Sequence, residues 1–439
     1  MSFSGEELSR MPEQRIHIDQ LRVGIFIRLE INWTHHPFLF RSFKIKSEDQ
    51  IDALKELGLR SVVFVPEKSD CMPGPLSAVS EETLEAASSQ TGQDTARQAS
   101  DALWEQKRTR VEFQRKHRRA IAACQEKFEQ TMQRVNRVIT NLGTASAEVL
   151  EEAESIMREI ASALVSDKDN AVHLVNTKAG AQDFFNHALN TSVLGMIVAR
   201  EYGFREGALQ KLGLGLLFHD IGKFRIPKSI LLKQASMTRA EIESLQLHPV
   251  YGEEMLSAAK GFPSESLDVV RHHHERIDGS GYPDKLSGNQ VSMGARVASL
   301  VNTYDNHCNK HDPKNSLTPA QTVSFMFTRQ RSLFDPQLLT TFIRCMGIHP
   351  PGSVVLLTDE SIGMVISVNS RNSLRPQVLV YDPETPRKEA PIIDLEAMPE
   401  LNILKSLRPG DLPPEVFDYL SPRTRVAYFI EQGAMKIKP

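Results

Sequence analysis

The sequence lacks the features of a membrane-spanning or secreted protein. No stretch reaches the ~18 consecutive apolar residues that a membrane-spanning helix needs, and the longest, around 212–218, is short and broken by glycine. The first residues, MSFSGEELSRMPEQ, have no apolar core and no cleavage-site pattern, so no secretory signal is expected. The four cysteines (Cys71, Cys124, Cys308 and Cys345) are far apart and form no C-x-x-C pair, which excludes a disulfide scaffold. We therefore expect a cytoplasmic protein with reduced thiols.

The sequence also has little net charge. Its 52 Lys and Arg residues nearly balance 55 Asp and Glu, which leaves a formal charge of −3. This balance argues against a nucleic-acid polymer as the partner of the whole chain. The composition, 40% hydrophobic and 24% charged, is typical of a folded globular protein. Because 439 residues exceed what one compact core can hold, we expect several domains.

The N-terminal part divides into a domain, a linker and a helix. Residues 1–71 predict a small α+β domain, because 15–19, 24–30 and 61–65 have strand patterns and a helix signal begins at Ser47. Residues 72–100 are rich in Ser, Thr, Ala, Gln and Pro, which predicts a flexible linker. Residues 101–150 predict a long connecting helix. Its basic run at 107–119 fits either a patch for an anionic partner or, as we prefer, a solvated face on a connecting or dimerising helix.

The rest of the chain predicts a mainly α fold. Residues 151–350 read as an almost entirely helical bundle, and 351–439 as a β-rich extension with strands at 353–358, 363–368 and 377–381. A fragment that begins near residue 145 is therefore expected to fold and to keep any metal.

Histidines and aspartates concentrate in this helical region. Asp183 precedes His187 by four residues, which puts both side chains on one face of a helix. His219 and Asp220 follow an apolar run, where an unpaired buried charge would be costly. Imidazole and carboxylate groups together suit first-row transition metals, and a shared carboxylate suits a bridged pair. A single such histidine is more often a core residue that has its hydrogen bonds, but this number of them predicts a metal centre.

These residues stand in strings that resemble the HD-GYP family of metal-dependent phosphohydrolases. The strings are His187, His219-Asp220-Ile-Gly-Lys223, His248-Pro-x-x-Gly252, and His273-His274-Glu275-x-x-Asp278-Gly279-x-Gly281-Tyr282-Pro283, with His272 as a neighbour outside the pattern. The resemblance covers about 155–350, and the front and tail resemble segments attached to some members. It implies an all-helical bundle with two or three divalent metals, most often iron or manganese. The implied activity is the hydrolysis of cyclic di-GMP, a bacterial second messenger used in signalling, to pGpG or GMP.

The resemblance also implies roles for individual residues. The implied metal ligands are His187, His219, Asp220, His248, His273, His274 and, for a third metal, Asp183. His219, Asp220 and Lys223 would be catalytic, and Lys223 would also contact the substrate phosphate. Gly281 and Tyr282 would form a substrate lip or a docking surface for signalling proteins. The alternative, equally weighted, is a tight turn that only positions His273 and His274.

The sequence departs from the family pattern in two places that bear on catalysis. Asn302-Thr-Tyr-Asp305-Asn306 replaces the usual Asp-x-x-Asp-Ala, so an amide stands at the ligand position Asn302. The usual Arg-x-Tyr-Arg/Lys string is replaced by His311-Asp-Pro-Lys314, in which Lys314 keeps a charge for phosphate and a protonated His311 would help. The alternative is therefore a catalytically weak regulator that binds cyclic di-GMP or a signalling partner. A third interpretation keeps hydrolysis but on another nucleotide, and we favour the enzyme.

Overall fold

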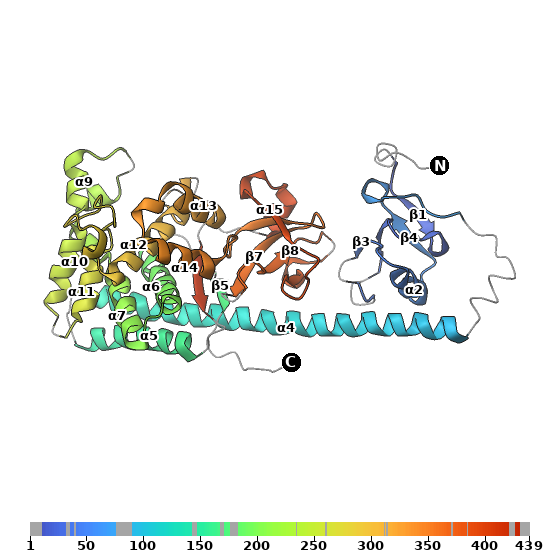
Figure 1. Cartoon of the computed structure of the whole chain (residues 1–439), viewed down its shortest axis with the longest axis horizontal. Coiled ribbons are helices and arrows are strands. Elements are labelled where there is room, and N and C mark those ends of the chain that lie inside the picture. Colours follow the sequence, from blue (N-terminus) through green and yellow to red (C-terminus); the bar gives the residue numbers. More distant parts are fainter. Residues whose placement is uncertain are drawn as a thin grey trace. The chain divides into compact units, whose positions relative to one another are not determined.

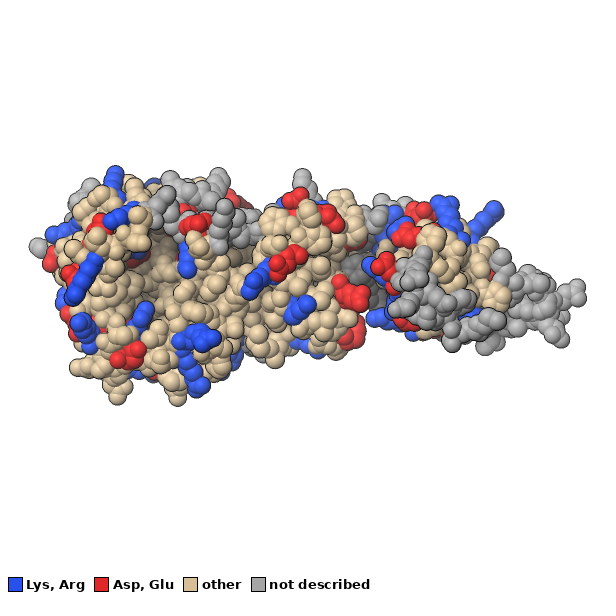
Figure 2. Space-filling model, turned by 90° about the horizontal axis from the view of Figure 1, so that it is seen from above, with Lys and Arg blue, Asp and Glu red and all other residues tan. Residues whose placement is uncertain are grey.

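A computed structural model gives the structure of the chain, which forms two compact units. It describes residues 11–31, 36–38, 41–75, 90–142, 147–166, 171–175, 183–233, 235–259, 261–310, 312, 315–369, 372–383, 385–420 and 426–430. The first unit comprises 1–117 with 382–386, and the second comprises 118–381 with 387–439. In the described part of the chain, every helix is too short or too polar to cross a bilayer. Acidic and basic side chains are interspersed on the face shown in Figure 2, as the small net charge leads one to expect.

The first unit contains the predicted small α+β domain (Figure 1). Its antiparallel sheet has the order β1-β4-β2-β3. The elements are β1 (Gln14–His17), η1 (Ile18–Gln20), β2 (Phe26–Arg28), β3 (Ser42–Lys44), α2 (Glu48–Glu56), β4 (Ser61–Phe64) and η3 (Pro66–Lys68). Ile25, Ile27 and Leu29 alternate with more exposed residues and are buried with Leu54 of α2 and Phe64 of β4. Burying one side of each element is what the alternating pattern predicts, and the expectation is confirmed.

Helix α4 (Gln90–Asn141) both begins and ends earlier than the helix expected at 101–150. It begins inside the segment predicted as a linker (72–100), because a helix that has formed propagates easily through residues such as Gln, Ala and Arg. Residues 76–89 of that segment lie outside the described residues. From residue 118 onward α4 belongs to the second unit, where Phe128, Val135 and Ile139 are buried in its core. This part of the helix is core and not merely a connection.

The second unit contains a helical bundle built around α6 (Asp183–Tyr202). Every residue of α6 from Ala188 to Ala199 is buried, including the polar Asn190, Thr191 and Ser192, so α6 is the central helix of the bundle. Helices α5, α7, α12 and α14 all pack on it. The other elements are α5 (Ala147–Ser166), α7 (Glu206–Phe218), η5 (Ile221–Arg225), α8 (Lys228–Leu231), α9 (Arg239–Leu245), α10 (His248–Ser257), α11 (Ser264–His272), η6 (Gly288–Gln290), α12 (Met293–Cys308), α13 (Pro319–Arg329), η8 (Arg331–Leu333) and α14 (Pro336–Met346).

An antiparallel sheet completes the second unit. Its strands run in the order β10-β6-β7-β5-β11, with β8 paired to β7 and β9 to β8. The elements are β5 (Ala171–Val175), β6 (Val354–Leu357), β7 (Ile362–Asn369), β8 (Gln377–Val380), η9 (Arg387–Glu389), β9 (Ile392–Asp394), β10 (Ile403–Leu407), η10 (Pro409–Asp411), α15 (Pro414–Leu420) and β11 (Ala427–Ile430). The three strands expected after residue 351 are confirmed. Strand β5 corrects the expectation of an almost entirely helical 151–350, because its partners β7 and β11 lie far away in the sequence.

The packing of α4 indicates that a stable fragment must begin near residue 118 and not near residue 145. A fragment that begins at residue 145 loses the α4 side chains buried in the core, each worth roughly 1.5–3 kcal/mol. We therefore expect it to aggregate or to melt well below a fragment that begins at residue 118, which should fold and bind metal. Thermal unfolding followed by circular dichroism compares the two. Equal melting temperatures would show that α4 is dispensable for this unit.

Candidate metal centre

Three histidines at helix ends have the same orientation. His219 follows α7, His273 follows α11, and His248 opens α10 just after α9. In each, Nδ1 donates a hydrogen bond to the carbonyl three residues earlier, at 2.6 Å for His219, 2.7 Å for His248 and 2.8 Å for His273. Carbonyls in the last turn of a helix lack partners within it and are free to accept these bonds. The proton therefore stays on Nδ1, and Nε2 presents its lone pair to a ligand.

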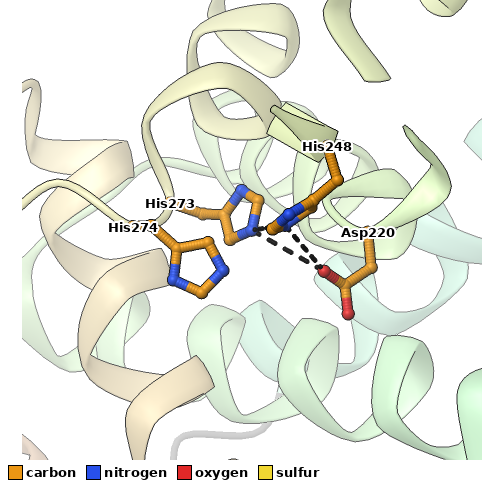
Figure 3. Close-up of side chains that lie close together, drawn as sticks. All are labelled: Asp220, His248, His273 and His274. Carbon is orange, nitrogen blue, oxygen red and sulfur yellow. Dashed lines mark hydrogen bonds and ion pairs between the residues drawn. The ribbon is translucent and has the colours of Figure 1, made fainter. Parts of the chain in front are cut away.

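The carboxylate of Asp220 lies between two groups of histidines. Its Oδ1 is 3.3 Å from Nε2 of His248 and 3.7 Å from Nε2 of His273 (Figure 3). Its Oδ2 is 3.5 Å from Nε2 of His187 and 3.6 Å from Nε2 of His219. We call Asp220, His248, His273 and His274 the His248 half-site, and His187, His219 and Asp220 the His187 half-site. In each half-site the possible ligand atoms all lie within 4.8 Å of one another.

The chemistry of these groups fits a bound cation. Asp220 Oδ1 is buried and accepts no hydrogen bond, although such an atom is costly to leave unsatisfied. The Nε2 atoms of His248 and His273 face each other at 3.2 Å, with the ring protons held on the opposite side. Two lone pairs at this distance beside a carboxylate repel one another unless a positive ion lies among them. The residues therefore fit one cation in each half-site.

The protonation states also suit metal ligands. Burial lowers the pKa of His219 to about 4 and those of His273 and His274 well below the ordinary value, so these rings are neutral at pH 7. Burial raises the pKa of Asp220, but opposing interactions, of which the positive charge of Lys223 is the largest, outweigh this effect and hold the pKa well below its ordinary value. Neutral imidazoles and an ionised carboxylate are the forms that bind metal ions.

His187 is held by a carboxylate on its other side. Its Nδ1 donates to Oδ2 of Asp305 in α12 at 2.5 Å, so its Nε2 points to Nε2 of His219, 3.1 Å away. A carboxylate behind a ligand histidine fixes the ring and increases its basicity. Burial lowers the pKa of His187, but the neighbouring Asp305 carboxylate outweighs this effect and raises the pKa above its ordinary value. The sequence pattern did not identify this orienting role. Asp305 keeps the second aspartate of the Asp-x-x-Asp-Ala string, and an aspartate there can equally be interpreted as a metal ligand.

The loop after His274 supports the turn that carries the two histidines. The ring of Tyr282 stacks on that of His274, with 4.5 Å between centroids. A Cβ on Gly281 would lie 2.5 Å from the Cα of Glu275, so only glycine fits against this backbone. Glu275 is buried and accepts hydrogen bonds from the main-chain N–H groups of Asp284 and Leu286. These contacts favour the positioning interpretation of the loop, while substrate contact by Gly281 and Tyr282 stays a prediction.

Other residues singled out in the sequence lie outside the two half-sites. Asp183 begins α6 and belongs to neither group of possible metal ligands in the described chain. Asn302 is buried in α12, where its Oδ1 accepts a hydrogen bond from Asn306 at 2.7 Å. Lys223 donates to Asp220 Oδ2 at 2.5 Å. His311 and Lys314 lie outside the described residues.

The amide at Asn302 leads to a prediction about metal retention. We expect Asn302→Asp to raise the metal content of the purified protein, because a carboxylate is a stronger ligand for a divalent cation and can still accept the bond from Asn306. Elemental analysis after exposure to a chelator measures the effect. Asn289→Asp, which adds the same charge at an exposed position, is the control. An unchanged metal content would show that Asn302 contributes nothing to ligation.

Three family models match successive parts of the chain. The family model described as HD domain matches residues 162–338. A domain of unknown function, DUF3391, matches 13–153, and the KOW domain associated with HD domain matches 354–413. The HD match includes all the histidines of both half-sites.

Several curated relatives are phosphodiesterases of cyclic dinucleotides. A cyclic di-GMP phosphodiesterase of Pseudomonas aeruginosa is 28% identical over 84% of this chain and 85% of its own length. The cyclic di-GMP phosphodiesterase response regulator RpfG of Xanthomonas campestris is 31% identical over 34% of this chain and 39% of its own length. A 3'3'-cGAMP-specific phosphodiesterase of Vibrio cholerae is 27% identical over 48% of this chain and 40% of its own length.

One solved structure adds a weaker similarity. A HDG"Y"P protein from Bdellovibrio bacteriovorus aligns with 75% of this chain and 98% of its own, at 16% identity and a TM-score of 0.39, too low to add to the assignment. The assignment stands on the sequence matches and on the shared carboxylate between the two half-sites. The chain carries an HD domain of the phosphohydrolase type, preceded by a DUF3391 domain, and its homologues include cyclic di-GMP phosphodiesterases.

Proposed function

We propose that the HD domain hydrolyses a phosphodiester bond of a cyclic dinucleotide, with cyclic di-GMP as the first candidate and pGpG or GMP as product. The observation that carries this proposal is Asp220, which offers one carboxylate oxygen to each of two histidine half-sites. The curated relative that matches most of the chain acts on the same substrate by its name. Nitrogen and oxygen ligands together suit iron or manganese.

The residues around the two half-sites can perform the remaining tasks of such a reaction. The two half-sites would hold divalent ions, whose Lewis acidity would activate water and offset the negative charge on the phosphate. Asp220 would contribute a ligand to both half-sites, and His219 would complete one of them. Lys223, about one third exposed beside Asp220, is positioned to bind a phosphate oxygen as a point charge. The ring of Tyr282 covers one face of the His274 ring.

A product assay tests the proposal directly. The full-length protein, loaded anaerobically with Mn²⁺ or Fe²⁺, is incubated separately with cyclic di-GMP, 3'3'-cGAMP and pGpG, and the nucleotides are separated by chromatography. We expect cyclic di-GMP to be consumed, with its product identifying one or two hydrolytic steps. His219→Ala is the inactive control. Protein that binds two ions and leaves all three nucleotides intact would contradict hydrolysis of this substrate class.

The alternative function is a weakly active regulator. It is favoured by Asn302, the amide at a position where the resemblance implies a carboxylate ligand. This regulator would bind cyclic di-GMP with a measurable dissociation constant but turn it over negligibly. Equilibrium dialysis with the nucleotide, followed by chromatography of the recovered ligand, separates binding from hydrolysis.

Lys223 gives a prediction about substrate alone. We expect Lys223→Ala to lower kcat/KM by the equivalent of about 1–3 kcal/mol, the value of a hydrogen bond to a charged group, while both ions remain bound. Steady-state kinetics and elemental analysis measure the two effects. Lys228→Ala removes an exposed lysine nearby in sequence and should change neither. Loss of metal from Lys223→Ala would assign the lysine to the centre itself.

A further inference from the structure

A strand from the C-terminal sheet is hydrogen-bonded to the bundle next to the metal centre. The main-chain N–H of Tyr428, in β11, donates to Oδ1 of Asn190 in α6 at 2.7 Å. Just before β11, the N–H of Val426 donates to Oδ1 of Asn309 at 2.8 Å, and the carbonyl of Val426 accepts from Nδ2 of Asn309 at 2.8 Å. Two asparagines thus bind the main chain of one segment.

The same two asparagines hold the carboxylate behind His187. Nδ2 of Asn190 donates to Oδ1 of Asp305, and Nδ2 of Asn309 donates to the same oxygen at 2.8 Å. The other oxygen of Asp305 accepts from His187. Asn190 and Asp305 are 1% and 2% exposed. Hydrogen bonds to an ionised acceptor away from water are among the strongest in a protein, so this arrangement fixes the carboxylate firmly.

The chemistry of the amide explains why an asparagine suits position 190. An amide has an acceptor on one side and donors on the other. Because the oxygen of Asn190 faces the main-chain N–H of Tyr428, its nitrogen must face Asp305. A carboxylate of the same shape could accept from the main chain but would repel Asp305. An alanine could do neither.

We propose that β11, acting through Asn190 and Asn309, positions the His187 half-site. Strand β11 pairs with β5, which pairs with β7, so the anchor is the whole C-terminal sheet and not a loose tail. Asn190 and Asn309 are positioning residues, because they act on the ligand His187 through Asp305. This inference rests on the proposed metal-dependent function and assigns the C-terminal sheet to the metal centre of the HD domain.

The test compares metal binding in three full-length variants. Asn190→Asp keeps the shape of the side chain and the oxygen that accepts from Tyr428. It replaces the nitrogen that donates to Asp305 with a second carboxylate oxygen, which repels Asp305. Asn309→Ala removes the second donor at a partly buried site. Tyr428→Phe is the matched control, because it keeps the main-chain N–H but loses buried hydroxyl bonds to Tyr304 and Pro351. Each is loaded with Mn²⁺, and ions per chain, the rate of extraction by a chelator and the melting temperature are measured without substrate.

The expected result is selective for one half-site. Both asparagine variants should lose one ion per chain, or release it at least tenfold faster, and retain the other, while Tyr428→Phe keeps both even where it melts earlier. If Asn190→Asp fails to fold, Asn309→Ala decides. The proposal is overturned if the asparagine variants hold both ions as wild type does. It is also overturned if metal loss in all three simply follows the loss of melting temperature. Wild-type protein that binds two ions without hydrolysing cyclic dinucleotides would contradict the proposed function and leave this inference standing.

Discussion

Replacing Asp220 with asparagine should remove both ions and abolish hydrolysis. Among the described residues, only Asp220 belongs to both groups of possible metal ligands, with one oxygen toward each. The amide keeps the shape of the side chain but loses its charge and puts a nitrogen where one ligand oxygen stood. Residues behind a metal ligand already change affinity by about 10–100-fold. Because Asp220 is a ligand shared by both half-sites, we expect its replacement to lower the hydrolysis rate by more than about 100-fold.

The experiment measures ions per chain and the hydrolysis rate of full-length Asp220→Asn. Asp268→Asn is the matched control, because Asp268 also binds a histidine, His272, at 2.8 Å but lies outside both half-sites. The control should retain both ions and its activity. If Asp220→Asn still binds two ions, the half-sites do not depend on a shared carboxylate.

Replacing Gly222 with alanine should destabilise the protein and displace His248. Gly222 lies in η5, which packs against the start of α10. A Cβ at this position would be 2.0 Å from the carbonyl oxygen of His248 and 2.5 Å from the main-chain nitrogen of Gly252. Both neighbours are backbone, so the two elements must move apart. Overpacking of this kind costs about 1–3 kcal/mol of unfolding free energy or more, and the movement shifts a metal ligand.

Urea unfolding and elemental analysis together test Gly222→Ala. We expect a lower midpoint and the loss of the ion in the His248 half-site. Gly207→Ala in α7 is the control, since a Cβ there meets no atom within 4 Å and alanine favours the helix. It should leave stability unchanged or raise it by up to about 1 kcal/mol. Wild-type stability and metal content in Gly222→Ala would mean that the two elements adjust without moving His248.

The clustering of the histidines with Asp220 was largely predictable from the sequence, because these residues stand in fixed local strings. His219 and Asp220 are neighbours, and His273 and His274 directly follow a single helix, so local structure already brings these groups close. The partners of Asp305 were not predictable in this way. Its contact with His187 depends on how α6 and α12 pack, and its contact with Asn190 depends on the same packing.

The fold was predictable where burial follows a local pattern. The strands around Ile27 and Val365 alternate or run apolar between turn residues, and the sequence predicts both. Strand β5 has only five residues and gains its partners from distant segments, so no local signal distinguishes it from a helix end. The role of α4 in the core was missed because its charged residues dominate the pattern, although Phe128 and Val135 recur on its buried face.

The pairing of β5 with β11 has a consequence for the order in which the protein matures. His173 and Phe429 are register partners more than 250 residues apart in the chain. During synthesis β5 emerges from the ribosome long before β11. The side of β5 that pairs with β11 therefore stays unpaired while the HD domain is translated. Contacts between distant segments form slowly, and exposed strand edges invite association with other chains. Chaperone binding to nascent chains is therefore expected to end only when β11 has been released.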